Sequence, residues 1–311
     1  FLTSAALRFH AKPVAEVACR STPRLQSKAK ALAQELRKLE PKDIKKQLHV
    51  NDALAKEYAK HLGNFEGQQP VPACCLFDNR MYDALGAPNF DDDDSRWANQ
   101  HVRMLSGLYG LLRPYDEIQA LSLPASLNTK LTNSKGKFLR DYWRDSVRQD
   151  LNDALQKLPM PVIINCAAEE DCQGILDLDG LPEGTRIASV EFKTIDREDA
   201  QDAKGEFLRW ALESRCMTVE ELLEFRGLEG EDDAASYRVS PKSSSTDALV
   251  FEENKGEGAG GGWSKKMAES GMNKAKFVKE FASGKNRYLR TEINKALVKE
   301  TKKNRKKTAV Y

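Results

Sequence analysis

Three consecutive carboxylates, Glu169, Glu170 and Asp171, follow the clearest candidate for a buried strand, the run Val-Ile-Ile-Asn at 162–165. This order predicts an acidic cluster in the loop after the strand. A carboxylate placed there can act as a general acid or base, and Glu170 is the catalytic candidate. A solvated acidic loop has the same pattern, so the residues alone leave both interpretations open.

Two basic residues, Lys204 and Arg209, flank Gly205 at the expected start of a helix. Free backbone N–H groups at a helix N-terminus bind anions, so Lys204 and Arg209 are predicted to bind phosphate. The alternative is that Arg209 forms an ion pair with Glu206 or Glu213 on the surface of the same helix.

A second basic group lies on two short helices expected at 42–48 and 52–62, which resemble a helix-hairpin-helix. Pro41 suits the first turn of one helix, and Asn51 is a good N-cap for the other. The N–H groups of the second helix can hold a phosphate, and lysines can neutralise its neighbours. The predicted phosphate-binding residues are Lys45, Lys46, Asn51 and Lys56. An ordinary helical hairpin with a solvated lysine face is the alternative.

The most unusual stretch is His101 to Asp116, HVRMLSGLYGLLRPYD. A helix is predicted from the N-cap Ser95 to Arg113, where the following proline ends it. Its buried face would follow the spacing i, i+4, i+7/8 and i+11. The residues at these positions are Trp97, His101, Met104, Leu105 and Leu108.

The same stretch resembles the signature of the YaaA family of peroxide-stress proteins, which reads close to QHxRMLSGLYGxLRPxD. The matching residues taken as signature residues are His101, Arg103, Ser106, Gly107, Tyr109, Gly110, Arg113, Pro114 and Asp116. Asn165 matches the asparagine of a second family motif, INLASxEY, in which Ala168 replaces the serine and Asp171 the tyrosine. The chain is therefore identified as a divergent member of this family.

The resemblance implies a mixed α/β (α+β) fold over residues 1–253. This single domain would contain a mixed β-sheet, surrounding helices, a helix-hairpin-helix at about 42–62 and a basic cleft that binds double-stranded or structured DNA. The family role is protection against peroxide, associated with less free intracellular iron and less oxidative damage to DNA. The leading hypothesis is accordingly a DNA-binding protein of the oxidative stress response.

The sequence does not decide whether the chain is an enzyme, and a non-catalytic protein is the preferred hypothesis. The family lysines expected near Leu7 and Asp78 and the arginine near Ser122 are replaced. A DNA-repair or nucleotide-acting enzyme that uses the same cleft is the alternative, and these losses would make it inactive or altered. A structural or protein-interaction role is a third hypothesis.

Charge is distributed unevenly along the 311 residues, although the net charge is only +2. Residues 254–311 carry 16 Lys/Arg and 5 Asp/Glu, a net of +11, and the remainder has a net of −9. A glycine-rich linker is predicted at 254–262. The basic extension at 263–311 is predicted to contact nucleic acid or to serve as a localisation signal, with a merely solvated tail as the alternative.

The cysteine and histidine positions predict no disulfide framework, no metal site and no cofactor. The six cysteines include no C-x-x-C pair, and the four histidines lack ligand spacing. This usage suits a reducing compartment such as the cytoplasm. Residues 1–30 have a basic composition typical of a transit peptide, and a first strand at 2–9 is the preferred alternative, so an organelle or the nucleus stays open. No apolar run is long enough for a membrane span, and a monomer is expected.

Overall fold

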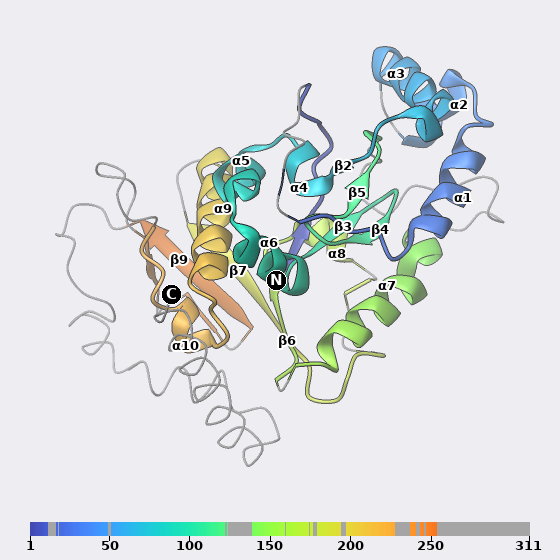
Figure 1. The fold of residues 1–311 in the computed structure, drawn as a ribbon. Coiled ribbons are helices and arrows are strands. Elements are labelled where there is room, and N and C mark those ends of the chain that lie inside the picture. Colours follow the sequence, from blue (N-terminus) through green and yellow to red (C-terminus); the bar gives the residue numbers. More distant parts are fainter. Residues whose placement is uncertain are drawn as a thin grey trace.

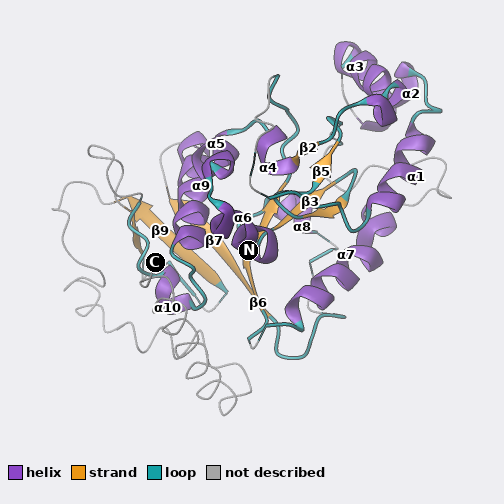
Figure 2. Cartoon of the chain, in the orientation of Figure 1, coloured by secondary structure: helices purple, strands orange, loops and turns teal. Residues whose placement is uncertain are grey.

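The computed structural model describes residues 1–11, 17, 19–48, 51–121, 123, 139–158, 160–173, 175–176, 179–193, 197–227, 237–240, 243–245 and 247–253. Figure 1 shows their arrangement, and Figure 2 shows the same view by secondary structure. The predicted linker at 254–262 and the basic extension at 263–311 lie outside the described residues, and so does the turn at 49–50.

A mixed sheet forms the centre of the described part, with the strand order β4-β3-β1-β6-β7-β9-β8. Its strands are β1 (Leu2–Ser4), β3 (Arg103–Ser106), β4 (Gly110–Leu112), β6 (Val162–Asn165), β7 (Arg186–Lys193), β8 (Tyr237–Val239) and β9 (Ala248–Glu253). The five inner strands are parallel, whereas β4 and β8 are antiparallel at the two edges. A smaller antiparallel pair joins β2 (Val71–Pro72) to β5 (Glu117–Ile118). The predicted mixed α/β fold is confirmed.

Helices surround the sheet, and the longest ones pack directly on it. The helices are α1 (Gln26–Leu36), α2 (Pro41–Leu48), α3 (Asp52–Gly63), α4 (Ala73–Leu76), α5 (Arg80–Leu85), α6 (Asp92–His101), α7 (Leu139–Leu155), α8 (Glu169–Cys172), α9 (Arg197–Glu213) and α10 (Val219–Leu222). Helix α9 contacts β7 on one side and α5 on the other, and α7 contacts β4. Short 3-10 turns lie at Phe65–Gly67 and Ala87–Asn89. None of the described helices combines the length and apolar character that a bilayer crossing requires.

The helix predicted from Ser95 to Arg113 is wrong over its second half. Helix α6 begins one turn earlier, where the Asp91 side chain accepts a hydrogen bond from the Asp94 backbone N–H at 2.8 Å, and it ends at His101. Strands β3 and β4 then form a hairpin. Both faces of this hairpin are buried, so apolar residues follow one another without alternation. Such a run contains apolar residues at helical spacing even though it does not form a helix. Gly110, with φ +72°, has a backbone conformation that no α-helix contains.

Other element predictions differ at their boundaries. The strand predicted at 70–77 is the short β2 followed by helix α4, and the strand predicted at 2–9 ends at Ser4. The helices at 139–155 and 52–63 and the strands at 162–165, 186–193, 237–239 and 248–253 confirm their predictions. Asn51 is the N-cap of α3, as expected, because its Oδ1 accepts from the Leu54 N–H at 2.9 Å.

Candidate functional site

Polar side chains gather at the carboxyl ends of β1 and β6, two neighbouring strands of the sheet. After β1 the chain adds β3 on one side of β1 and then β6 on the other, so the strand order reverses between β1 and β6. In open α/β sheets, ligands bind beside this reversal of strand order, because the loops there diverge. We call this group the switch-point cluster. It comprises Ser4, Tyr82, Asn165, Asp171 and Lys204.

Ser4 joins three elements in the switch-point cluster. The Tyr82 hydroxyl, from α5, donates to the Ser4 carbonyl oxygen at 2.8 Å, and the Ala168 N–H before α8 donates to Ser4 Oγ at 3.0 Å. Burial raises the pKa of Tyr82, with only 3% of the residue exposed, so the phenol stays protonated and acts as a hydrogen-bond donor.

Asp171, rather than Glu170, is the buried carboxylate of the cluster. Only 7% of Asp171 is exposed, whereas Glu170 is solvent-exposed. Burial raises the pKa of Asp171, a hydrogen bond with Ser4 lowers it, and the nearby Glu170 charge raises it again. Helix α8 has only four residues, so no periodicity in the sequence could show which of its carboxylates points inward. The catalytic role assigned to Glu170 stays a prediction.

Lys204 reaches the cluster from the middle of a helix. The predicted helix start near Gly205 is wrong, because α9 begins at Arg197, and residues 204 and 205 therefore offer no free helix-terminal N–H groups. The Lys204 Nζ lies 3.3 Å from the Cys166 carbonyl oxygen at the end of β6. Lys204 thus supplies a cation beside the switch-point cluster without a helix-dipole site.

Arg209 forms the surface ion pair that the sequence offered as the alternative to phosphate binding. Its Nε lies 2.9 Å from Glu213 Oε1, one turn further along α9. Gly205 serves close packing instead, since a Cβ there would lie 2.3 Å from the Met81 carbonyl oxygen of α5. A phosphate contact of Arg209 would have to compete with the Glu213 carboxylate.

Two buried thiols border the cluster but are poorly suited to nucleophilic chemistry. Burial raises the pKa of Cys166 and of Cys172 to about 11, so both stay protonated near neutral pH. Asn165 Oδ1 accepts from the Ala167 N–H at 3.0 Å and from the Cys172 thiol at 3.6 Å, which fixes the turn after β6. The cluster can therefore present the Lys204 ammonium group to an anionic or carbonyl-bearing group, whereas the Tyr82 O–H is already donated to the Ser4 carbonyl oxygen.

The α2–α3 lysines lie apart from the switch-point cluster. Figure 1 shows α2 and α3 at the upper right and α9, which carries Lys204, at the left. Lys45 Nζ lies 2.9 Å from Asp52 Oδ2, while Lys46 and Lys56 are solvent-exposed. The structure therefore separates the predicted phosphate-binding residues into two places. The helix-hairpin-helix stays a prediction, because its turn at 49–50 lies outside the described residues.

Three signature residues, Ser106, Gly107 and Tyr109, hold the β3–β4 hairpin in place. The Gly107 carbonyl oxygen accepts from the Trp143 indole at 2.8 Å, and Ser106 Oγ accepts from the Tyr109 N–H at 3.2 Å. The Tyr109 hydroxyl donates to Gln119 Oε1 at 2.8 Å. These bonds fasten the hairpin to α7 and to the segment after β5, so this part of the signature is structural.

The end of the signature forms an ion pair between a buried carboxylate and a partly buried guanidinium. Asp116, 1% exposed, accepts from the Arg113 N–H at 2.8 Å and from the Arg113 guanidinium at 2.9 Å. The Ser21 hydroxyl also donates to Asp116 Oδ1 at 2.7 Å. The Pro114 carbonyl oxygen accepts from the Cys74 N–H at 2.9 Å, which fastens α4 to the same turn. Within the described residues, no group of three His, Cys, Asp or Glu side chains is placed to hold a metal ion.

Asp171 makes the stability of the protein depend on pH. Its pKa is raised in the folded state, so its contribution to the free energy of unfolding is present below the ordinary pKa and is lost as pH rises through the folded value. We expect Asp171→Asn to gain stability relative to the parent as pH rises from 4 to 7. Urea unfolding at both pH values measures this; an unchanged difference would contradict the burial of the charge. The control is Glu183→Gln, which removes an exposed carboxylate outside the switch-point cluster; a gain of the same size there would contradict the assignment to Asp171.

Together these features define a mixed α/β protein with a buried polar cluster at the reversal of strand order in its sheet. Residues 2–233 match the family described as peroxide stress protein YaaA, and the chain belongs to this family. It is 33% identical over 239 residues to a UPF0246 protein of Cereibacter sphaeroides, with 74% of this chain and 89% of the relative covered. UPF0246 proteins of Tolumonas auensis and Caulobacter vibrioides are 32% and 30% identical, with 74% of this chain and 88% and 89% of the relatives covered. Membership of this family supports a role in the response to peroxide.

Proposed function

We propose that this protein acts in the peroxide response by binding DNA through the outer face of α2 and α3, and that this binding protects DNA from oxidative damage. The observation that carries the proposal is the solvent-exposed lysine face of these two helices. Ile44, Ala55 and Tyr58 bury the opposite face against the body, so the lysines must point outward. The family role in peroxide stress is consistent with such a target.

The charges on this face favour contacts to phosphate rather than to bases. Lys42 and Lys45 already pair with Glu40 and Asp52 at 2.7 and 2.9 Å, whereas Lys46 and Lys56 are exposed without a described ion pair. Flexible lysines neutralise phosphates and carry little sequence information. We therefore expect affinity that is salt-sensitive and nearly independent of base sequence.

The test is duplex DNA binding by the full chain across a salt series, with the double variant Lys46→Glu/Lys56→Glu. We expect the affinity for DNA to fall on the order of tenfold or more. The slope of log K against the logarithm of the salt concentration should decrease in magnitude by about two, since each lost phosphate contact lowers that magnitude by about 0.9. The matched control is Lys30→Glu/Lys157→Glu, which makes the same charge change at exposed positions of α1 and just after α7. Equal losses in both double variants would mean that general charge, and not the α2–α3 face, governs binding.

A second comparison separates the body from the basic extension. The full chain and a chain ending at Glu253 are measured in parallel, with duplex and with junction DNA. Binding by the shorter chain with a slope of several phosphates supports the α2–α3 face. If only the full chain binds, the 16 basic residues of 254–311 carry the affinity, and the proposal for α2–α3 fails.

An enzyme that acts on damaged DNA or a nucleotide is the second candidate function. The switch-point cluster favours it, because buried Asp171, Tyr82 and the cation of Lys204 converge where ligands bind in related sheets. Cleavage of duplexes with an abasic or oxidised site is the assay. The enzyme hypothesis expects activity that Asp171→Asn or Glu170→Gln abolishes, while DNA affinity is unchanged. If the parent cleaves none of these duplexes, this candidate is withdrawn.

A further inference from the structure

Two adjacent cysteines, Cys74 and Cys75, lie on α4 and take no part in the switch-point cluster. They are the only cysteines that are neighbours in the sequence. Their sulfur atoms lie 3.7 Å apart, and each residue is 2% exposed. Each thiol therefore has a second nucleophilic sulfur in direct contact, inside a protein whose family acts in the response to peroxide.

The two thiols are chemically unequal. The Cys74 S–H donates to the sulfur of Cys75 and lowers the pKa of Cys75; burial raises that pKa, the nearby Arg20 guanidinium lowers it, and the net direction is downward. Burial, followed by the same hydrogen bond, raises the pKa of Cys74 well above its ordinary value. Because the thiolate is the nucleophilic form, Cys75 is the better attacking sulfur, and Cys74 holds a proton beside it.

Helix α4 is a single turn, which matters for access to the buried thiols. The Phe77 N–H donates to the Ala73 carbonyl oxygen at 3.0 Å and closes the turn. The Cys74 N–H donates to the Pro114 carbonyl oxygen at 2.9 Å, and the Ala73 N–H donates to that of Asp116 at 3.0 Å. A segment this short opens locally without unfolding of the whole domain. Such opening admits a small neutral molecule such as hydrogen peroxide, which is little larger than water.

We propose that Cys74 and Cys75 are a site of reversible oxidation by hydrogen peroxide, with Cys75 as the attacking sulfur and Cys74 as the resolving thiol. The Cys75 thiolate attacks one peroxide oxygen, so an S–O bond forms, the O–O bond breaks, and the released hydroxide takes the Cys74 proton. The Cys74 thiolate then attacks the sulfenic sulfur of Cys75. An S–S bond forms, and the departing hydroxide takes back the proton that Cys75 had lost to solvent. In total, two thiols lose two electrons, and one peroxide becomes two waters.

The bridge between neighbouring residues is reversible because its geometry is strained. Adjacent Cα atoms are about 3.8 Å apart across a trans peptide, which is closer than the roughly 4.4–6.8 Å of ordinary disulfides. The sulfur atoms must also approach from 3.7 Å to about 2.0 Å, so the α4 turn has to rearrange. Disulfides strained in this way are easily reduced and are typical of redox sensing in reducing compartments. The proposal does not depend on DNA binding through the α2–α3 face.

The test treats the reduced full chain with hydrogen peroxide, alkylates it after denaturation and measures the masses of its tryptic peptides. Trypsin cleaves after Lys60 and Arg80, so peptide 61–80 contains Cys74 and Cys75 and no other cysteine. We expect this peptide to carry no alkyl group and to be two hydrogen atoms lighter than the dithiol, and dithiothreitol to restore both alkylation sites. A peptide that keeps both alkyl groups, or that gains oxygen atoms without a bridge, overturns the proposal.

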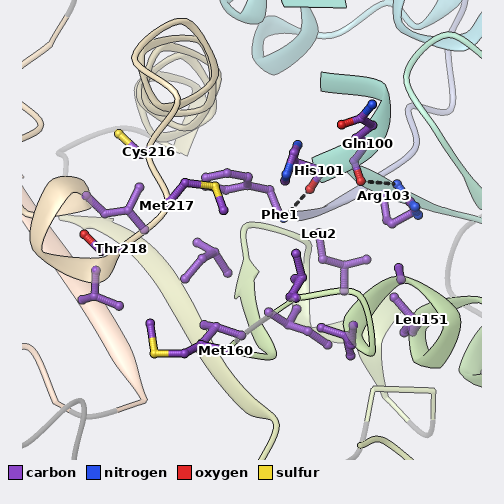
Figure 3. A pocket seen from close by; sticks show the side chains of 18 residues that line it. Phe1, Leu2, Gln100, His101, Arg103, Leu151, Met160, Cys216, Met217 and Thr218 are labelled. Atoms are coloured by element: carbon purple, nitrogen blue, oxygen red, sulfur yellow. Dashed lines mark hydrogen bonds between the residues drawn. The ribbon is translucent and has the colours of Figure 1, made fainter. Parts of the chain in front are cut away.

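Cys216 is the internal comparison for access. It lines a separate cavity together with residues of β6, α7 and α10, and Figure 3 shows it among these side chains. Cys216 is 8% exposed, against 2% for Cys75. If access alone governed oxidation, Cys216 in peptide 216–226 would react before Cys75. We expect peptide 61–80 to be oxidised first, because the Cys74 thiol both activates Cys75 and resolves its sulfenic acid. Oxidation of Cys216 before any bridge forms would contradict this.

Two variants separate the roles of the two sulfurs. Cys74→Ser removes the resolving thiol, so we expect peroxide to leave a sulfenic acid on Cys75 that dimedone labels. Cys75→Ser removes the attacking sulfur, so Cys74 should stay available for alkylation at the peroxide exposure that bridges the parent. Equal dimedone labelling of the two folded variants would overturn the assignment of Cys75 as the attacking sulfur. Thermal melting checks the fold of each variant; if either is unfolded, the mass of peptide 61–80 from the parent decides the proposal.

Discussion

Gly205→Ala lowers the free energy of unfolding by about 2–4 kcal/mol, although alanine is the better helix former by about 1 kcal/mol. The added Cβ would lie 2.3 Å from the Met81 carbonyl oxygen, 2.7 Å from Ala84 Cβ and 3.0 Å from the Leu85 backbone N. Two of these three atoms belong to the backbone of α5, which cannot rotate away as a side chain can. Helices α5 and α9 must therefore separate, and α9 also packs on β7.

Equilibrium urea unfolding measures this change, with Gly63→Ala as the matched control. Gly63 lies in the last turn of α3, and a Cβ there meets no atom within 4 Å. We expect the control to be neutral or more stable by up to about 1 kcal/mol. A Gly205→Ala variant as stable as the parent would mean that α5 and α9 do not approach as closely as described.

Asp116→Ala is expected to cost about 3–5 kcal/mol, because it leaves the partly buried Arg113 guanidinium without its carboxylate. Asp116 accepts hydrogen bonds from the Arg113 backbone, the Arg113 side chain and Ser21, so the segments at Ser21 and at Arg113 lose their common anchor when it is removed. The Arg113 guanidinium also donates to the Thr22 carbonyl oxygen at 2.8 Å, so the segment before α1 should loosen.

Urea unfolding and hydrogen exchange of residues near Ser21 are the measurements. Asp92→Ala is the control, because its exposed carboxylate is 3.4 Å from Arg96 Nη2 across one turn of α6. Such surface pairs contribute up to about 1 kcal/mol. If both aspartate variants lose the same small free energy of unfolding, Asp116 is not the anchor of this turn, and the end of the signature has another role.

Elements with one dominant local signal were predictable from the sequence. Asn51 has the side chain of an N-cap and caps α3, and the apolar run at 162–165 forms β6. The periodic helix at 139–155 also forms as predicted. The signature in the stretch from His101 to Asp116 identified the family, although the same stretch was assigned to the wrong secondary structure.

The hairpin after α6 shows why local pattern failed there. Met104, Leu105, Leu108, Leu111 and Leu112 are all buried, so neither a period of 3.6 nor a period of 2 distinguishes their faces. Pairing of β3 with β1 decides the matter, because it places these residues in the centre of a sheet. That partner lies about a hundred residues away in the chain and leaves no mark on the local sequence.

By itself, the sequence determined the family, the α/β class and the residue types available for chemistry. Tertiary structure alone decided which of these residues meet. Asp171 is buried and its neighbour Glu170 is exposed, Lys204 points to the end of β6, and Arg209 pairs with Glu213. The physical reason is that propensity and periodicity act over a few residues. Burial and the pKa shifts that follow from it depend on segments that come together only when the sheet forms.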